Sequence, residues 1–197
     1  MQVQRVSEPH KQLECFRFIQ QNVAGFTAAK AAKEEATVRR QVTHILPRTP
    51  DGLLAAAIVL RAVDSSGTTV GVAVAHPPYA EAVEVTARLG IEYAQGLLQS
   101  RRTLSGLAVR EDARRTGVGR ALVDAALTIA ADEQALWMTG FMDERNGSPE
   151  FYESVGFTTM PRNTVVPRLT PFPLPEIHPS YVNGQWFYRP IGLSPTA

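Results

Sequence analysis

The sequence predicts an α/β domain with a mixed central sheet flanked by helices, and three patterns indicate this. Apolar residues at helical spacing alternate along the chain with short apolar runs that are typical of strands. Residues 53–63 and 68–75 flank the turn signal at residues 65–67 and predict an antiparallel hairpin. Residues 135–142 form a nearly continuous apolar run, which is typical of a strand covered on both faces, as in a parallel pair.

The other elements follow from spacing, propensity and turn residues. Longer helices are predicted at residues 7–23, 27–39, 79–99 and 117–132, and a short one at 149–155. Further strands are predicted at residues 3–6, 104–109, 157–160 and 185–191. Gly90 and Gly96 weaken the helix predicted at residues 79–99. The proline-rich segment at residues 161–179 suits neither helix nor central strand and predicts a stiff surface loop.

Composition limits the class of protein. The chain has 197 residues, 44% of them hydrophobic, which suits one compact domain. Its formal net charge of +1 gives no long-range field for a nucleic acid or an anionic membrane. The single cysteine, Cys15, is expected to be a buried small hydrophobe, as in a reducing compartment. Without a signal-like start or a long apolar span, a cytoplasmic protein with no membrane segment is expected.

An anion site is predicted where a strand runs through a polar loop into a helix that begins with Gly117 and Gly119. The first N–H groups of a helix lack internal partners, and the helix dipole favours negative charge there. Glycine lets a phosphate approach the backbone closely. Three nearby arginines can pair with phosphate: Arg114, Arg115 and Arg120. The combination favours a pyrophosphate ligand.

Two other phosphate motifs fit this segment less well. A P-loop requires Lys and then Ser or Thr after the glycines, and this chain has Arg120 and Ala121. A dinucleotide fingerprint requires a third glycine where Leu122 stands, and its first glycine directly after the strand.

The segment resembles the GNAT superfamily of acyl-CoA-dependent N-acetyltransferases. Arg114-x-x-Gly117-x-Gly119 is similar to the family signature Arg/Gln-x-x-Gly-x-Gly/Ala, and residues 151–157 resemble its second signature. The resemblance implies one N-acetyltransferase domain over residues 1–197, clearest at 104–160, with a Pro-rich loop at 161–184 before a final strand. It also implies a sheet splayed between its fourth and fifth strands, residues 104–109 and 135–142.

The resemblance also implies a site for acetyl-CoA as co-substrate, without a metal. The strand backbone at Leu107, Ala108 and Val109 would bind the pantetheine arm. The pyrophosphate would lie against the amides of Arg114, Arg115, Thr116, Gly117, Val118, Gly119 and Arg120. Tyr152 stands at the usual general-acid position, although it could instead only pack between helix and cofactor. Asn146 could serve for an asparagine that the family often has where this chain has Arg145.

The chain departs from the family pattern in its general base. Many members carry a glutamate on the fourth strand, where this chain has Thr103 and Ser105. A water held by Ser105 could provide the route for the proton, or Glu92 or His76 could act as the base. A solvated helix charge is the favoured interpretation of Glu92, and a surface residue at a strand end that of His76.

The resemblance implies transfer of an acetyl or related acyl group to a primary amine of a small molecule or peptide. The acceptor is expected in a groove walled by the first two helices and the Pro-rich loop. The main alternative is an inactive GNAT module that binds acetyl-CoA as a sensor or assembly component. Action on aminoacyl-tRNA is disfavoured by the charge, so no nucleic acid is expected. The oligomeric state is left open, and a homodimer is possible because many relatives dimerise.

Overall fold

A computed structural model describes residues 1–23, 57–143, 145, 148–164, 168–174 and 183–192. Within these residues, seven strands form one sheet in the order β1-β2-β3-β4-β5-β7-β6. They are β1 (Gln2–Arg5), β2 (Ile58–Val63), β3 (Thr69–His76), β4 (Arg101–Val109), β5 (Trp137–Asp143), β6 (Thr158–Thr159) and β7 (Gly184–Pro190). The β4–β5 pair is parallel and the other pairs are antiparallel. The mixed sheet, the hairpin (β2 and β3) and the parallel pair are confirmed.

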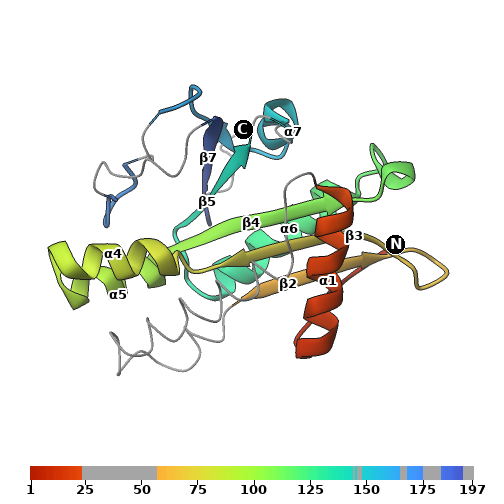
Figure 1. The fold of residues 1–197 in the computed structure, drawn as a ribbon, viewed down its shortest axis with the longest axis horizontal. Helices are drawn as coiled ribbons and strands as arrows, with labels where there is room; N and C mark the ends of the chain where they lie inside the picture. Colours follow the sequence, from red (N-terminus) through yellow and green to blue (C-terminus); the bar gives the residue numbers. More distant parts are fainter. Residues whose placement is uncertain (24–56, 144, 146–147, 165–167, 175–182, 193–197) are drawn as a thin grey trace.

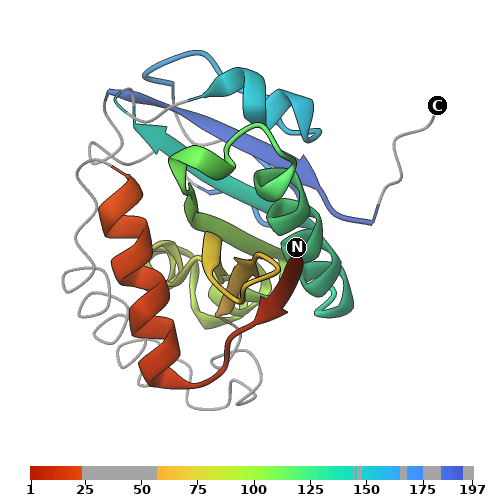
Figure 2. The ribbon, with the colours of Figure 1, turned by 90° about the vertical axis from the view of Figure 1, so that its right-hand side faces the viewer.

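Helices cover both faces of the sheet. They are α1 (Pro9–Asn22), α4 (Tyr79–Leu89), α5 (Ile91–Ser100), α6 (Val118–Asp132) and α7 (Pro149–Ser154), with a 3₁₀ turn at Glu111–Ala113. Alternating residues of β2 point to different clusters: Leu60 packs with α6 and Val59 with α1. Figure 2 shows α1 and α6 on opposite sides of the strands. Cys15 is buried in the α1 cluster, as the sequence predicts, and burial raises its pKa to about 11.

The single helix predicted at residues 79–99 is wrong, because two helices, α4 and α5, meet at Gly90. Gly90 has φ +85° and ψ 172°, a conformation that glycine adopts without a Cβ clash. Figure 1 shows the two helices side by side at the end of the sheet where β3 ends and β4 begins. The helix predicted at residues 27–39 lies outside the described residues, as does the start of the strand predicted at 53–63.

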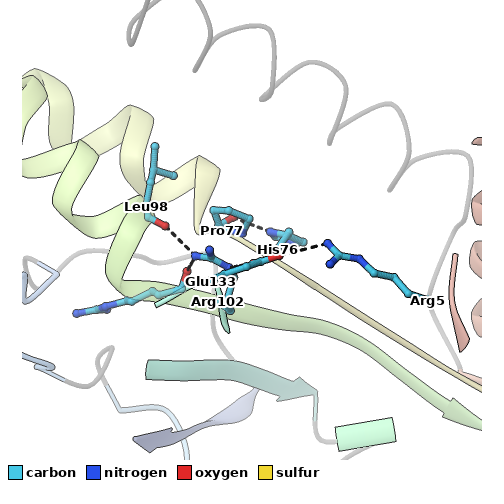
Figure 3. A network of polar contacts seen from close by, with 7 residues as sticks. Arg5, His76, Pro77, Leu98, Arg102 and Glu133 are labelled. Atoms are coloured by element: carbon cyan, nitrogen blue, oxygen red, sulfur yellow. Dashed lines mark hydrogen bonds and ion pairs between the residues drawn. The ribbon is translucent and has the colours of Figure 1, made fainter. Parts of the chain in front are cut away.

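Strand β4 begins three residues earlier than predicted, with Arg101 and Arg102, which are 1% and 2% exposed. Arg102 donates from Nε to Glu133 Oε2 at 3.0 Å and from Nη1 to the carbonyl of Leu98 at 2.9 Å. Glu133 also pairs with Arg5 at 3.2 Å (Figure 3). Because its charge is paired and its N–H groups are satisfied, Arg102 fits inside the sheet, where a buried arginine would otherwise be costly.

Residues 168–174, here called the strap, are held down by three side chains. Arg101 Nη2 donates to the carbonyls of Leu169 at 2.8 Å and Phe172 at 2.6 Å. Trp137 and Tyr93 bind two further strap carbonyls at 2.7 and 2.5 Å. The strap is therefore docked on α5, β4 and β5, and this part of the Pro-rich segment is less exposed than the predicted surface loop.

Replacing Arg101 with methionine is expected to lower the free energy of unfolding by about 2–4 kcal/mol, because two charge-assisted hydrogen bonds to the strap are lost. Urea denaturation measures this change. Arg88→Met is the matched control, since Arg88 is exposed on α4. Equal effects of the two substitutions would contradict the anchoring role of Arg101.

Candidate functional site

The strands β4 and β5 part shortly after they begin. They pair only at residues 101–103 with 137–139, and the last pair is Thr103 with Thr139. Beyond it, the described residues of β4 pair with β3 alone, and those of β5 with β7 (Figure 1). This confirms the predicted splay. It leaves one backbone edge of β4 at Leu107, Ala108 and Val109 without a strand partner in the described part of the chain.

Gly140, the first residue after the last β4–β5 pair, makes room for an aromatic ring. A Cβ at this position would overlap the ring of Phe187 and lie 2.9 Å from the carbonyl oxygen of Leu104. Phe187 on β7 therefore packs at the point where the two strands separate. No local sequence signal marks Gly140, whereas the aromatic pattern of residues 185–191 predicts that Phe187 lies on a strand.

A bulge in β4 exposes Ser105 beside the same point. Ala75 pairs with Leu104 and Val74 with Gly106, so Ser105 is one residue extra. Its side chain is exposed although β4 is a central strand, and its Oγ lies 3.4 Å from the carbonyl oxygen of Val74. The bulge thus presents a hydroxyl, and no carboxylate, at the opening of the sheet.

The N-terminus of α6 lies at the far end of β4. Gly117 is its N-cap residue, in the left-handed conformation with φ +88° and no side-chain cap. The first helical bond runs from the Ala121 N–H to the Gly117 carbonyl at 3.0 Å, so the preceding amides have no acceptor within the helix. No atom lies within 4 Å of a Cβ built on Gly117, whereas one on Gly119 would lie 3.1 Å from the Phe151 ring. Gly119 therefore also lets α7 pack closely against α6.

The arginines at residues 114–120, around the N-terminus of α6, make different contacts. Arg114 donates from Nε to the Val109 carbonyl at 3.2 Å, and Arg120 donates from Nη2 to the Ser154 carbonyl at 2.8 Å. Arg115 is exposed with φ +63°. The Thr116 hydroxyl donates to the Ala113 carbonyl at 2.7 Å. Arg120 thus joins α6 to α7, which the sequence did not indicate, and the turn keeps its net positive charge.

Tyr152 on α7 lies in a cluster of aromatic rings. Its ring stacks on Phe187 with centroids 3.9 Å apart and planes at 18°, and it meets Phe151 and Phe157 edge to face. Burial raises the pKa of Tyr152 to about 12. Its hydroxyl has no hydrogen-bond partner among the described residues. Because Phe187 also packs on Gly140, Tyr152 is connected through one ring to the point where β4 and β5 separate.

The other candidates are placed as follows. Asn146 lies outside the described residues, and Arg145 pairs with Asp143 at 2.8 Å. Glu92 is exposed on α5, which agrees with a solvated helix charge. His76 ends β3 and pairs with Thr103.

In the described part of the chain, no group of three or more His, Cys, Asp or Glu is arranged to hold a metal ion, and no helix could span a membrane.

This fold and site define a class of α/β domain in which a mixed sheet opens beside a helix N-terminus and a half-buried tyrosine. The family model of the acetyltransferase (GNAT) family matches residues 27–157, and the chain belongs to that family. None of the curated proteins matches the sequence significantly.

Solved structures share the fold at low sequence identity. Ard1 from Thermoplasma volcanium has a TM-score of 0.56 at 17% identity, covering 97% of this chain and 99% of its own. The ribosomal-protein-S18-alanine N-acetyltransferase from Escherichia coli has a TM-score of 0.55 at 14% identity, covering 98% and 96%. The phosphinothricin acetyltransferase from Sinorhizobium meliloti, in complex with AcCoA, has a TM-score of 0.55 at 14% identity, covering 98% and 90%. At such identities these similarities describe the fold alone.

Proposed function

We propose that this chain transfers an acetyl group from acetyl-CoA to a primary amine of a small molecule or peptide, by direct attack. The observation that carries the proposal is the opening between β4 and β5, with the α6 N-terminus at one end and Tyr152 stacked beside it. The structural relatives named above include enzymes whose names specify a protein substrate and a small-molecule substrate. The proposed acceptors therefore include both small molecules and peptides.

The residues at the opening fit acetyl-CoA. The backbone edge of β4 at Leu107, Ala108 and Val109, which has no strand partner among the described residues, can take the amides of the pantetheine arm as an added strand would. The Val109 carbonyl already accepts a hydrogen bond from Arg114. The amides from Arg115 to Arg120, which have no backbone acceptor among the described residues, suit the pyrophosphate, and open space at Gly117 admits it. The Arg114 N–H donates to the Glu111 carbonyl at 3.2 Å, so Arg114 would contribute its positive charge. Asn146, outside the described residues, is proposed as a further contact. When bound, acetyl-CoA supplies an activated acyl group as a thioester.

The reaction requires one group that removes a proton and one that supplies a proton. The neutral amine attacks the thioester carbon, a C–N bond forms, and the C–S bond breaks. Tyr152 donates its phenolic proton to the departing sulfur, and the proton lost by the amide nitrogen restores the phenol. With a pKa of about 12, Tyr152 is protonated at neutral pH, as an ordinary phenol also is, so the proton is available at this moment.

One observation favours the alternative of an inactive module that binds acetyl-CoA as a sensor or assembly component. The β4 bulge presents Ser105, so the strand supplies no carboxylate to remove a proton from an ammonium group. The hydroxyl of Tyr152, which has no hydrogen-bond partner among the described residues, favours the enzyme, because a residue that served packing alone would not need it.

Steady-state release of the CoA thiol tests the proposal. The panel should contain small amines, peptides with free N-termini and peptides with internal lysines, each with acetyl-CoA, and calorimetry should measure CoA binding. We expect turnover with at least one class of acceptor. Binding of acetyl-CoA without turnover over the whole panel would support the inactive module, and absence of binding would contradict both.

A further inference from the structure

His76 stands at the end of β3, beside the place where the sheet opens. We propose that His76 is the general base that removes a proton from the ammonium form of the acceptor. This inference rests on the proposed function and deepens it, because it names the group that stands in for a carboxylate on β4.

The hydrogen bond of His76 fixes its tautomer. Its Nδ1 lies 2.7 Å from the carbonyl oxygen of Pro77 (Figure 3). A carbonyl oxygen can only accept, so Nδ1 carries the hydrogen, and in the neutral ring Nε2 keeps its lone pair. Among the described residues, Nε2 has no hydrogen-bond partner. The ring also stacks on Tyr79, with centroids 5.8 Å apart and planes at 8°. His76 is therefore oriented as a base with its free nitrogen available.

The register of the sheet places His76 close to the opening. His76 pairs with Thr103, and Thr103 with Thr139, the last pair between β4 and β5. Two strand spacings, roughly 10 Å, therefore separate the backbones of β3 and β5 at this row. The exposed Ser105 of the bulge follows Thr103 by two residues. A base at this position can reach an amine at the opening directly or through one water.

His76 also lies on the face of the sheet opposite to α6. Ala75 packs in the cluster of α6, and successive residues of a strand point to opposite faces. Val118 at the start of α6 and Tyr152 both pack with the α6 cluster, on the side that the proposed function assigns to the cofactor. An amine that enters from the other face therefore meets the side that carries His76.

The chemistry suits an imidazole. A primary ammonium group, with a pKa near that of lysine, about 10.4, must lose a proton before it attacks, and the hydroxyls of Thr103 and Ser105 do not accept one at neutral pH. Nε2 takes that proton, the nitrogen lone pair attacks the thioester carbon, and the imidazolium later releases the proton to solvent. Among the described residues, Tyr79 from α4 is a titratable side chain that stacks against the ring. Arg101, two residues before Thr103, directs its guanidinium to the strap.

His76→Ala tests the proposal with an acceptor that the amine panel identifies. The kcat/KM of the wild type should show an inflection on the acid side of its pH profile, because protonation of the base removes its lone pair. In His76→Ala this inflection should vanish, kcat should drop about 10²-fold at neutral pH, and added imidazole should restore part of the rate. His10→Ala, at an exposed position on α1, is the matched control and should keep the full rate.

Two readouts separate a base from a structural residue. ¹⁵N NMR should find neutral His76 with its hydrogen on Nδ1, and thermal unfolding of His76→Ala should match that of the wild type. Retention of the inflection in His76→Ala, or a rate loss that imidazole does not restore, would overturn the assignment of the base while leaving acetyl transfer intact. A wild type that turns over no amine would contradict the transfer itself.

Discussion

Tyr152→Phe is expected to lower kcat by about 10²–10⁴-fold, the usual contribution of a general acid. The substitution removes one hydroxyl and keeps the ring, so the stack on Phe187 and the edge contacts to Phe151 and Phe157 persist. Because the hydroxyl makes no hydrogen bond to a described residue, its loss should not weaken the fold. Thiol-release kinetics measure the rate, and calorimetry with CoA should give an unchanged affinity.

The pKa of Tyr152 adds a test by pH. Burial raises this pKa to about 12 from an ordinary value of 10, so the folded protein keeps the proton where the unfolded chain loses it. The free energy of unfolding should therefore fall as the pH rises from about 10 to 12. Tyr152→Phe should remove this part of the fall, which urea denaturation at several pH values measures. A variant that keeps kcat within fivefold would contradict the acid role.

Local signals in the sequence predicted the segment from β4 to α6 well. A strand followed by a polar loop and two glycines determines where α6 begins, and the left-handed Gly117 explains why glycine is needed there. The apolar run at residues 135–142 predicted a parallel strand because both of its faces are covered. The splay followed from the family resemblance, and no local pattern indicates that pairing ends at Thr139.

The features that the sequence did not reveal depend on contacts between distant segments. Arg101 and Arg102 begin a buried strand only because carbonyls of the strap and of α5, together with Glu133, accept hydrogen bonds from their guanidinium groups. The partner of Tyr152 is Phe187, which comes from the strand after the Pro-rich segment. The need for glycine at position 140, where a Cβ would overlap the Phe187 ring, becomes apparent only once the pairing of the strands is known. Such positions can be interpreted from the sequence only after the topology is known.

Gly117→Glu is expected to reduce CoA affinity at least tenfold, about 1.4 kcal/mol of binding free energy. A carboxylate at the first turn of α6 would compete for the free amides and repel the pyrophosphate. The same charge interacts favourably with the helix dipole, so the helix itself should not unfold. Calorimetry with CoA measures the affinity, and thermal unfolding reports on the fold.

Gly67→Glu separates ligand repulsion from backbone strain. Gly67 lies in the β2–β3 turn with φ +82° and, like Gly117 at φ +88°, would have no atom within 4 Å of an added Cβ. Both substitutions force a side chain onto a left-handed residue, at a cost of about 1–2 kcal/mol, so both variants should lose similar stability. Only Gly117→Glu should lose CoA affinity, because Gly117 caps α6, whose N-terminal amides are proposed to bind the pyrophosphate, and Gly67 does not. Equal affinities in the two variants would mean that the α6 turn does not hold the pyrophosphate.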